Sequence, residues 1–509
     1  MSWIVVRNIV SNWIGLVATI LVGFLLTPFV IRELGYVGYG FWALLQSLLS
    51  YMFLLEFGVR ASLNRHLAKF FAIRASLEAN RVINTGLMVY LAVCVVVIAS
   101  SIALGLTFQQ VFSFQELDAG TILWAVVLVG TSVALQFPAA VFESVLTGYQ
   151  RYDLMNVASI ASLLMRTMVI ILSLKLGYGI LGIAWATFLG SALLLLLNYL
   201  LAARVYPDLS VNVSLAESST FTMLGHHSIF AFILIGGTRI ITDAGNILVG
   251  AFVGAAAVTF YAIAGSLTTY ALSVIGGIST TIAPRASDLE ARGNHEGLKT
   301  LCLTGTRFIL LIGLPILLTF VLSGDMFVRL WVGEGYGQSY GPLVLLSISW
   351  AFNFIQSASA CILMGVSRHK IAAWLVLVQA ALNVVLSLYL VRSIGMLGVA
   401  WGALISSVVM NLVFQVHALR LLEIPIGRFF VQAIAPAGIA LLPFAAALVM
   451  LFATYTPPNL LVYFGCVGIA VACMAVFVPW LGLTRDEREA GWRRIAGWMQ
   501  QAGVLACKS

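Results

Sequence analysis

The sequence has very little charge for its length. Only 9% of its 509 residues are Asp, Glu, Lys or Arg, whereas 61% are hydrophobic. A typical soluble domain has about 25% charged residues, because its outer surface needs polar groups. This composition excludes a water-soluble globular protein. Lipid must be the solvent for most of the chain, and the sequence predicts a polytopic membrane protein.

Alternating apolar segments and long polar loops are also missing. The apolar runs are continuous, which excludes membrane-spanning strands, and a spanning segment that satisfies its own backbone is a helix. We therefore predict an all-α fold. No loop is long enough to hold a folded domain, since the longest have about twenty residues.

The signatures of soluble enzymes are absent as well. The chain has no P-loop, no arguable Ser-His-Asp arrangement and no zinc-ligand spacing, and its six cysteines are scattered. We expect a protein that is not an enzyme, needs no cofactor and hydrolyses no ATP. Active transport would draw on an ion gradient or on downstream consumption of the substrate. The first apolar run lacks a small-residue cleavage site, so we expect it to be a transmembrane helix.

Fourteen apolar runs approach the roughly 20 residues needed to cross a hydrocarbon core of about 30 Å. They lie near 9–31, 39–57, 83–106, 120–140, 156–175, 179–202, 228–250, 256–282, 305–323, 342–364, 371–391, 396–418, 429–452 and 460–482.

The positions of Lys and Arg predict the orientation of these helices. With a cytoplasmic N-terminus, twenty of them fall in inner loops and tails and four in outer loops. Both termini are then cytoplasmic, and the net charge of +8 mainly reflects topology. No basic segment alternates with aromatics, so no nucleic-acid partner is expected. The tail, 483–509, carries Trp492, Ile495 and Trp498 at helical spacing, which predicts an amphipathic helix on the inner membrane face.

An internal repeat divides the chain. The segment GILGIAW at Gly179–Trp185 recurs as GMLGVAW at Gly395–Trp401, 216 positions later. This offset covers six helices, and an even number preserves orientation, so we predict two parallel six-helix repeats. The predicted parts are a bundle at 1–210, a second bundle at 225–425 and two additional helices at 426–482. Such paired bundles are typical of transporters, whereas a channel would form a ring.

One predicted span carries a polar stripe. Arg239, Thr242, Asp243 and Asn246 lie at i, i+3, i+4 and i+7, on one face of a helix. A lipid-facing arginine costs about 2.5 kcal/mol or far more, so this face must contact protein or water. Two interpretations stay open. The pair fixes helix packing, or Arg239 attracts an anionic substrate group while Asp243 binds a coupling ion or neutralises Arg239 in the empty site.

Three other cations lie in or beside the predicted spans. Glu56 and Arg60 are also four residues apart; Arg60 either follows the positive-inside rule or lines a cavity. Arg166 lies in the middle of an apolar helix and is either a packed structural arginine or a lumen cation. Arg307 lies one turn into its helix, and we expect it to extend to the inner membrane surface.

Two passages resemble a known family. Leu25–Arg65 contains Thr27-Pro28-Phe29, Leu34-Gly35, Tyr39-Gly40 and an acidic residue before Gly58, and Asp243–Leu267 reads DAGNILVGAFVGAAAVTFYAIAGSL. Both are similar to the polysaccharide transporters of the multidrug/oligosaccharidyl-lipid/polysaccharide exporter superfamily. The acidic residue of the first passage, Glu56 here, is more often Asp in that family.

The resemblance implies a V-shaped pair of six-helix bundles with two extra helices in a bacterial inner membrane. It implies a flippase that moves an undecaprenyl-pyrophosphate-linked oligosaccharide, such as an O-antigen unit of lipopolysaccharide, to the periplasm. The expected partners are that substrate, membrane lipids, and glycan polymerase and assembly proteins. We predict Arg239, Arg60 and Arg166 as substrate-binding residues and Asp243 and Glu56 as ion-coupling residues.

Three alternatives stay open. Within the superfamily, these are a multidrug antiporter, which usually has twelve helices and acidic cavities, and a peptidoglycan-precursor flippase, which shares the fourteen-helix plan. A membrane polysaccharide polymerase is the alternative from another class. Such enzymes tend to carry a large periplasmic loop, and every predicted outer loop here is short.

Overall fold

The computed structural model describes residues 3–112, 114, 116–217, 220–221, 229–279, 281–366, 370–482 and 488–489. Over these residues the chain is helical and contains no strand. Thirteen of the described segments are long and apolar enough to cross a membrane, which confirms the predicted all-α polytopic class. The predicted amphipathic tail lies outside the described residues, apart from Arg488 and Glu489.

The chain divides into two compact units, Met1–Ser266 with Lys370–Ser406, and Leu267–His369 with Ser407–Ser509. The helices of the first unit are α1 (Trp3–Ser50), η1 (Tyr51–Glu56), α2 (Val59–Ala72), α3 (Ser76–Val111), α4 (Ala119–Gly148), α5 (Tyr152–Lys175), α6 (Gly179–Val205), η2 (Val213–Leu215), α8 (Ile229–Phe252) and α13 (Lys370–Ile394).

The helices of the second unit are α10 (Ile282–Ala291), α11 (His295–Trp331), η3 (Glu334–Ser339), α12 (Tyr340–Gly365), α15 (Ile426–Phe429), η4 (Phe430–Ile434), α16 (Ala435–Thr454), α17 (Leu460–Phe477) and η5 (Val478–Gly482). Two further helices, α9 (Ala255–Ser279) and α14 (Met396–Leu421), begin in the first unit and end in the second. The predicted division into bundles at 1–210 and 225–425 stays a prediction.

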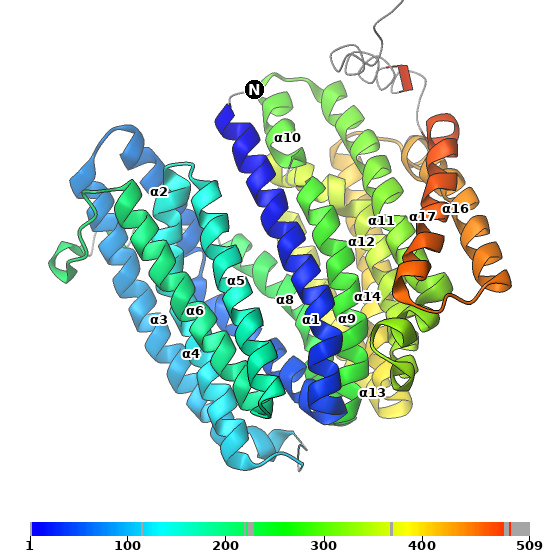
Figure 1. Cartoon of the computed structure of the whole chain (residues 1–509). Coiled ribbons are helices and arrows are strands. Elements are labelled where there is room, and N and C mark those ends of the chain that lie inside the picture. The colour runs from blue at the N-terminus through cyan, green and yellow to red at the C-terminus, as the bar shows by residue number, and fades with distance from the viewer. Residues whose placement is uncertain are drawn as a thin grey trace, which may run out of the picture. The chain divides into compact units, whose positions relative to one another are not determined.

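The two spans predicted at 9–31 and 39–57 are joined in α1. Gly35 alone interrupts this 48-residue helix, with φ 66° and ψ −173°. An unbroken helix of that length would extend about 70 Å, at 1.5 Å per residue, more than twice the hydrocarbon core. The left-handed conformation at Gly35 therefore separates two spans without a loop. Figure 1 shows the first of them as a long rod that leaves the N-terminus.

Two segments expected as loops are helices. α2 buries Val59, Leu63 and Leu67 while its Arg and Lys residues lie on other faces, so a charged connection forms an amphipathic helix. α10 does the same with Ile282, Ala286 and Leu289. The sequence showed these segments only as breaks in hydrophobicity, because their apolar stripes are too narrow to raise the mean hydropathy.

The internal repeat is visible in the backbone. Gly35 and Gly254, 219 positions apart, both have positive φ, and so do Gly179 and Gly395, 216 positions apart. The second offset equals that of the sequence match between Gly179–Trp185 and Gly395–Trp401. The left-handed glycines thus fall at corresponding positions of the two predicted repeats, where consecutive helices meet.

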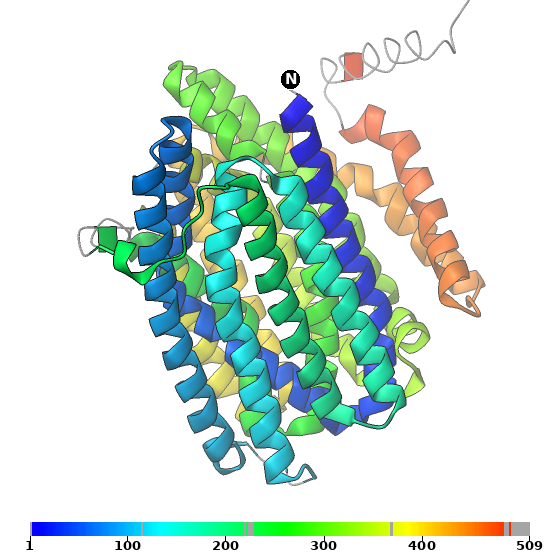
Figure 2. The ribbon, with the colours of Figure 1, turned by 60° about the vertical axis from the view of Figure 1, so that its left-hand side comes forward.

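Within the first unit, α3, α4, α6 and α5 lie side by side (Figures 1 and 2). The second part of α1 packs against α8 and the start of α9. Thr259 donates a hydrogen bond of 2.5 Å to the carbonyl of Tyr36, and Gly40 lies against the carbonyl of Ala255 so closely that no side chain fits between them. This contact places the beginning of α9 directly on α1.

The second unit corrects one expectation. Arg307 does not extend to the membrane surface: it is 3% exposed, and its Nη1 donates to the carbonyl of Gln432 over 3.0 Å. Gln432 belongs to η4, a π-helical turn, which lies against α11. A buried guanidinium needs an acceptor inside the protein, and this backbone oxygen supplies one.

We predict that Gly40→Ala lowers the free energy of unfolding by about 1–3 kcal/mol, the usual cost of overpacking. The new Cβ would meet backbone atoms of Ala255, which cannot rotate away. Gly468→Ala in α17 is the control, because a Cβ there has no neighbour within 4 Å. The measurement is the temperature at which half of the detergent-solubilised protein loses its monodisperse elution peak. Equal midpoints for both variants would contradict the close contact.

Candidate functional site: three arginines in the first unit

All five residues predicted to bind substrate or ions lie in the first unit. Arg239 and Asp243 are on α8, Glu56 ends η1, Arg60 is in the first turn of α2, and Arg166 is on α5. Each arginine has different surroundings, so we describe three sites in turn.

The polar stripe of α8 faces α1. Arg239 Nη1 lies 3.6 Å from Asp243 Oδ2, and the same oxygen accepts a hydrogen bond of 2.6 Å from Ser50. One turn further along α8, Asn246 Nδ2 donates to Ser47 Oγ over 2.9 Å. Asp243 is therefore held from two helices, while 43% of the Arg239 side chain stays exposed. The guanidinium also lies 5.9 Å from the centre of the Phe53 ring, within cation–π distance.

A break in the second predicted span organises the next site. After the six-residue 3₁₀-helix η1, both Phe57 (φ 45°) and Gly58 (φ 77°) adopt the left-handed conformation. A bulky residue at positive φ is rare, and such strain clusters at functional sites. Discontinuous spans also form the binding sites of many transporters. Phe57 stacks on Phe232 of α8 with ring centres 5.3 Å apart, which holds the break against that helix.

Arg60 begins α2 directly after this break and meets two carboxylates. Its Nη2 lies 2.5 Å from Glu143 Oε2, and its Nε lies 3.8 Å from Glu56 Oε1. Tyr90 donates to Glu56 Oε1 over 3.4 Å. Glu143 is not among the site residues predicted from the sequence. It is the one acidic residue of α4. An ionisable residue in an apolar span is by default a functional candidate, so its position in the sequence could have identified it.

Aromatic rings connect these two sites. The ring of Phe53, which lies near Arg239, has its centre 5.9 Å from the centre of the Phe137 ring. The Phe137 ring centre is in turn 5.6 Å from that of Tyr90, the partner of Glu56. η1 thus contributes to both sites, through Phe53 to Arg239 and through Glu56 to Arg60. A movement of this short helix would alter both arginines together.

Arg166 has a different environment. Within the described part of the chain it has no carboxylate partner. It lines a cavity of about 140 Å³ between α1, α5 and α6. Its carbon stem lies against Gly190 of α6, where an added Cβ would be 3.1 Å from Arg166 Cβ.

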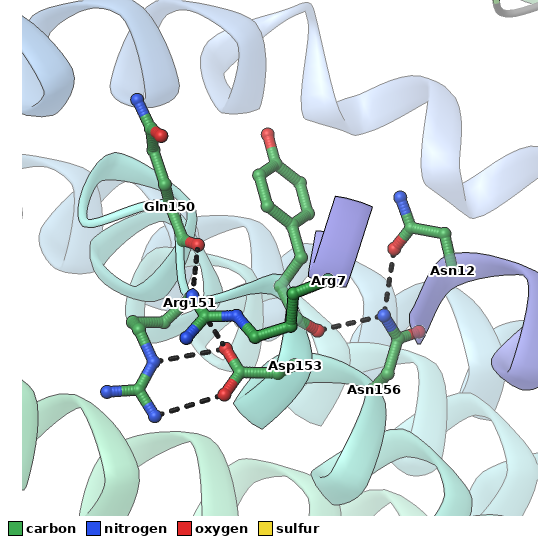
Figure 3. Close-up of polar contacts among 7 residues, drawn as sticks. Arg7, Asn12, Gln150, Arg151, Asp153 and Asn156 are labelled. Atoms are coloured by element: carbon green, nitrogen blue, oxygen red, sulfur yellow. Dashed lines mark hydrogen bonds and ion pairs between the residues drawn. The ribbon is translucent and has the colours of Figure 1, made fainter. Parts of the chain in front are cut away.

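A polar cluster joins the N-terminal part of α1 to the beginning of α5 (Figure 3). Asp153 pairs with Arg7 at 3.5 Å and with Arg151 at 3.0 Å, and Asn156 donates to Asn12 over 2.8 Å. The hydrogen bond to Asp153 raises the pKa of the Arg151 guanidinium. These charges are all paired, so we assign the cluster to helix packing. Among the described residues, no three His, Cys, Asp or Glu side chains group to hold a metal ion.

Comparison with known proteins identifies the family. Residues 74–341 match the family described as "Polysaccharide biosynthesis protein". The chain belongs to this family. A search of curated proteins found no match.

Solved structures share the fold. A lipid II flippase, MurJ, in an inward closed conformation has a TM-score of 0.71 at 12% identity, over 93% of this chain and 98% of that one. An inward-facing multidrug resistance MATE family transporter of the MOP superfamily has a TM-score of 0.68 at 14% identity, over 83% and 98% of the two chains. An outward-facing MATE transporter has a TM-score of 0.61 at 15% identity, over 82% and 95%. Family and fold together support a transporter or flippase of polysaccharide biosynthesis.

We predict that Arg60 and Glu143 are energetically coupled. Glu143→Gln or Arg60→Gln alone leaves a partly buried charge without its partner, so each should lower thermal stability by more than half of the loss in the double variant. The coupling energy from the double-mutant cycle should be about 0.5–3 kcal/mol.

The exposed pair Arg292–Asp288, at 2.8 Å with 71% of the arginine side chain exposed, is the matched control. Its coupling should be below about 1 kcal/mol. Additive losses at Arg60 and Glu143, indistinguishable from the control pair, would show that the contact has no energetic weight.

Proposed function

We propose that this protein is a flippase that moves an undecaprenyl-pyrophosphate-linked oligosaccharide from the cytoplasmic to the periplasmic leaflet of a bacterial inner membrane. It does so by alternating access, with both termini in the cytoplasm and without covalent chemistry. The observation that carries the proposal is that one unit places Arg166 and Arg239 within candidate membrane spans and Arg60 just after the end of another. Membership of the polysaccharide biosynthesis family supports the glycan as cargo.

The charges of the sites suit such a substrate. A pyrophosphate carries negative charges that cannot enter hydrocarbon, and guanidinium groups bind phosphate oxygens in pairs. The lipid tail stays in the bilayer while the head group passes. Arg239 and Arg60 keep 43% and 42% of their side chains exposed, so a head group can reach them.

The carboxylates act as internal counter-ions in this account. Asp243 neutralises Arg239 in the empty state and Glu143 neutralises Arg60, so that neither cation is left alone. A bound pyrophosphate competes for the same guanidinium nitrogens. The carboxylate that it displaces then gains affinity for a proton or another cation, which gives Asp243 its proposed role in ion coupling. Glu56, the second carboxylate beside Arg60, would gain the same affinity when the head group takes over that guanidinium.

The alternatives differ in what they require of these sites. A drug antiporter for cationic compounds needs carboxylates that are free to meet the drug, whereas Glu56, Glu143 and Asp243 each lie beside an arginine. A peptidoglycan-precursor flippase would use the same pyrophosphate chemistry, and only the glycan distinguishes it. A polymerase would extend a glycan in a purified reaction, which transport does not require.

We predict that Arg239→Ala reduces the amount of cell-surface glycan at least tenfold, because the pyrophosphate loses a direct partner, while the protein still accumulates in the membrane. Arg239→Lys should retain part of the export, since the charge remains but the paired hydrogen bonds do not. Arg292→Ala, which removes an exposed arginine, is the control. The assay is surface glycan per unit of membrane-inserted protein. Unchanged export in Arg239→Ala would remove Arg239 from the substrate path.

A further inference from the structure

The residues that line the cavity at Arg166 suit a sugar that carries a negative group. We propose that it binds one anionic sugar ring, a monosaccharide unit that carries a carboxylate or a phosphate. This inference rests on the proposed function and gives it a substrate class: glycans with at least one acidic sugar. The cavity is lined by Gly23, Leu26, Thr27, Val30, Tyr39, Trp42, Gln46, Arg166, Ile170, Ile183 and Thr187.

The size of the cavity limits the ligand. Its volume is about 140 Å³, and cavities of about 150 Å³ admit one six-membered ring such as benzene. A complete oligosaccharide does not fit. Because the cavity is partly open, the negative group and one side of a single ring can enter it while the rest of the glycan stays outside. The cavity lies wholly in the first unit, between the two parts of α1, α5 and α6, so that its walls do not depend on the second unit.

The positive charge of Arg166 favours an anionic ligand in this cavity. Arg60 and Arg239 have carboxylate partners, but Arg166 has none among the described residues. A cation in a membrane-spanning helix without a counter-charge is costly, and a bound anion would offset that cost. The carbon stem of Arg166 lies against Gly190, and Ser162 Oγ donates to the Gly190 carbonyl over 2.8 Å, so the stem is held at a tight crossing of α5 and α6.

The neutral lining suits sugar hydroxyl groups. Thr27 donates its hydroxyl proton to the Gly23 carbonyl over 2.7 Å, and Thr187 donates to the Ile183 carbonyl over 2.8 Å. Each threonine therefore presents only acceptor lone pairs to the cavity, which complement hydroxyl donors. Gln46 adds an amide that donates and accepts, and Trp42 offers an aromatic surface for the carbon face of a ring.

This site is separate from the Arg239 pair, although both use α1. Tyr39, Trp42 and Gln46 are at i, i+3 and i+7 and face the Arg166 cavity. Ser47 and Ser50 face α8 instead. One helix thus offers one face to the proposed sugar site and another to the proposed pyrophosphate site.

The test is calorimetric titration of the purified full-length protein in detergent with glucuronate, glucose 1-phosphate, glucose and inorganic phosphate. We expect glucuronate or glucose 1-phosphate to bind at least tenfold more tightly than glucose. The tighter of the two identifies carboxylate or phosphate as the recognised group. Arg166→Gln should weaken that binding at least tenfold, whereas Arg292→Ala, which removes an exposed arginine of the second unit, should change it less than twofold.

A second variant separates the ring from the charge. Trp42→Leu should weaken binding of the acidic sugar at least tenfold and leave inorganic phosphate binding unchanged, and it serves also if Arg166→Gln does not fold. Glucose binding as tightly as the acidic sugars, inorganic phosphate binding as tightly as glucose 1-phosphate, no binding of any acidic sugar, or full affinity in Arg166→Gln would each overturn the proposal. Loss of export in Arg239→Ala tests the flippase function independently, so the two proposals can fail separately.

Discussion

A guanidinium that lies in hydrocarbon without an anion, polar groups or water around it raises the free energy of the protein by at least about 2.5 kcal/mol. This constraint explains the arrangement of the first unit. Arg239 is met by Asp243 and Phe53, Arg60 by Glu143 and Glu56, and Arg166 by a polar cavity. In each case helices far apart in the sequence approach one another around the charge. The arginines are both the substrate contacts of our proposal and the points on which helix packing depends.

The break in the second predicted span links the two arginine pairs to a segment that can move. Continuous helices resist local change because each turn is hydrogen-bonded to the next, whereas η1 and the left-handed Phe57 and Gly58 form a short separate element. Phe53 and Glu56 extend from this element toward the two arginine pairs. A substrate that displaces either carboxylate would therefore act on the same short segment, which offers a physical route from binding to a change of access.

Sequence reasoning found the helices and the local pairs but not the partners from other helices. The sequence predicts the pairs Arg239–Asp243 and Arg60–Glu56, because residues four positions apart lie on the same face of a helix. Glu143 is 83 positions from Arg60, and Ser50 is 193 positions from Asp243, so no local pattern links them. The break at Phe57 was equally hidden, because its strain is fixed by contacts such as the Phe232 ring and not by residue type. The charged connections α2 and α10 are helices that hydropathy does not predict, because their narrow apolar stripes are lost in the average.

Water access to the polar stripe of α8 tests the central claim most directly. Thr242 lies on that stripe between Arg239 and Asp243. With the native cysteines replaced, a cysteine at position 242 should react with a membrane-impermeant thiol reagent from at least one side of the membrane, and lipid-linked oligosaccharide should slow the reaction. A cysteine at position 175, at the end of α5, is the accessible control. Normal labelling of the control with no labelling at 242 from either side would contradict the account, because the stripe would then be sealed in dry packing.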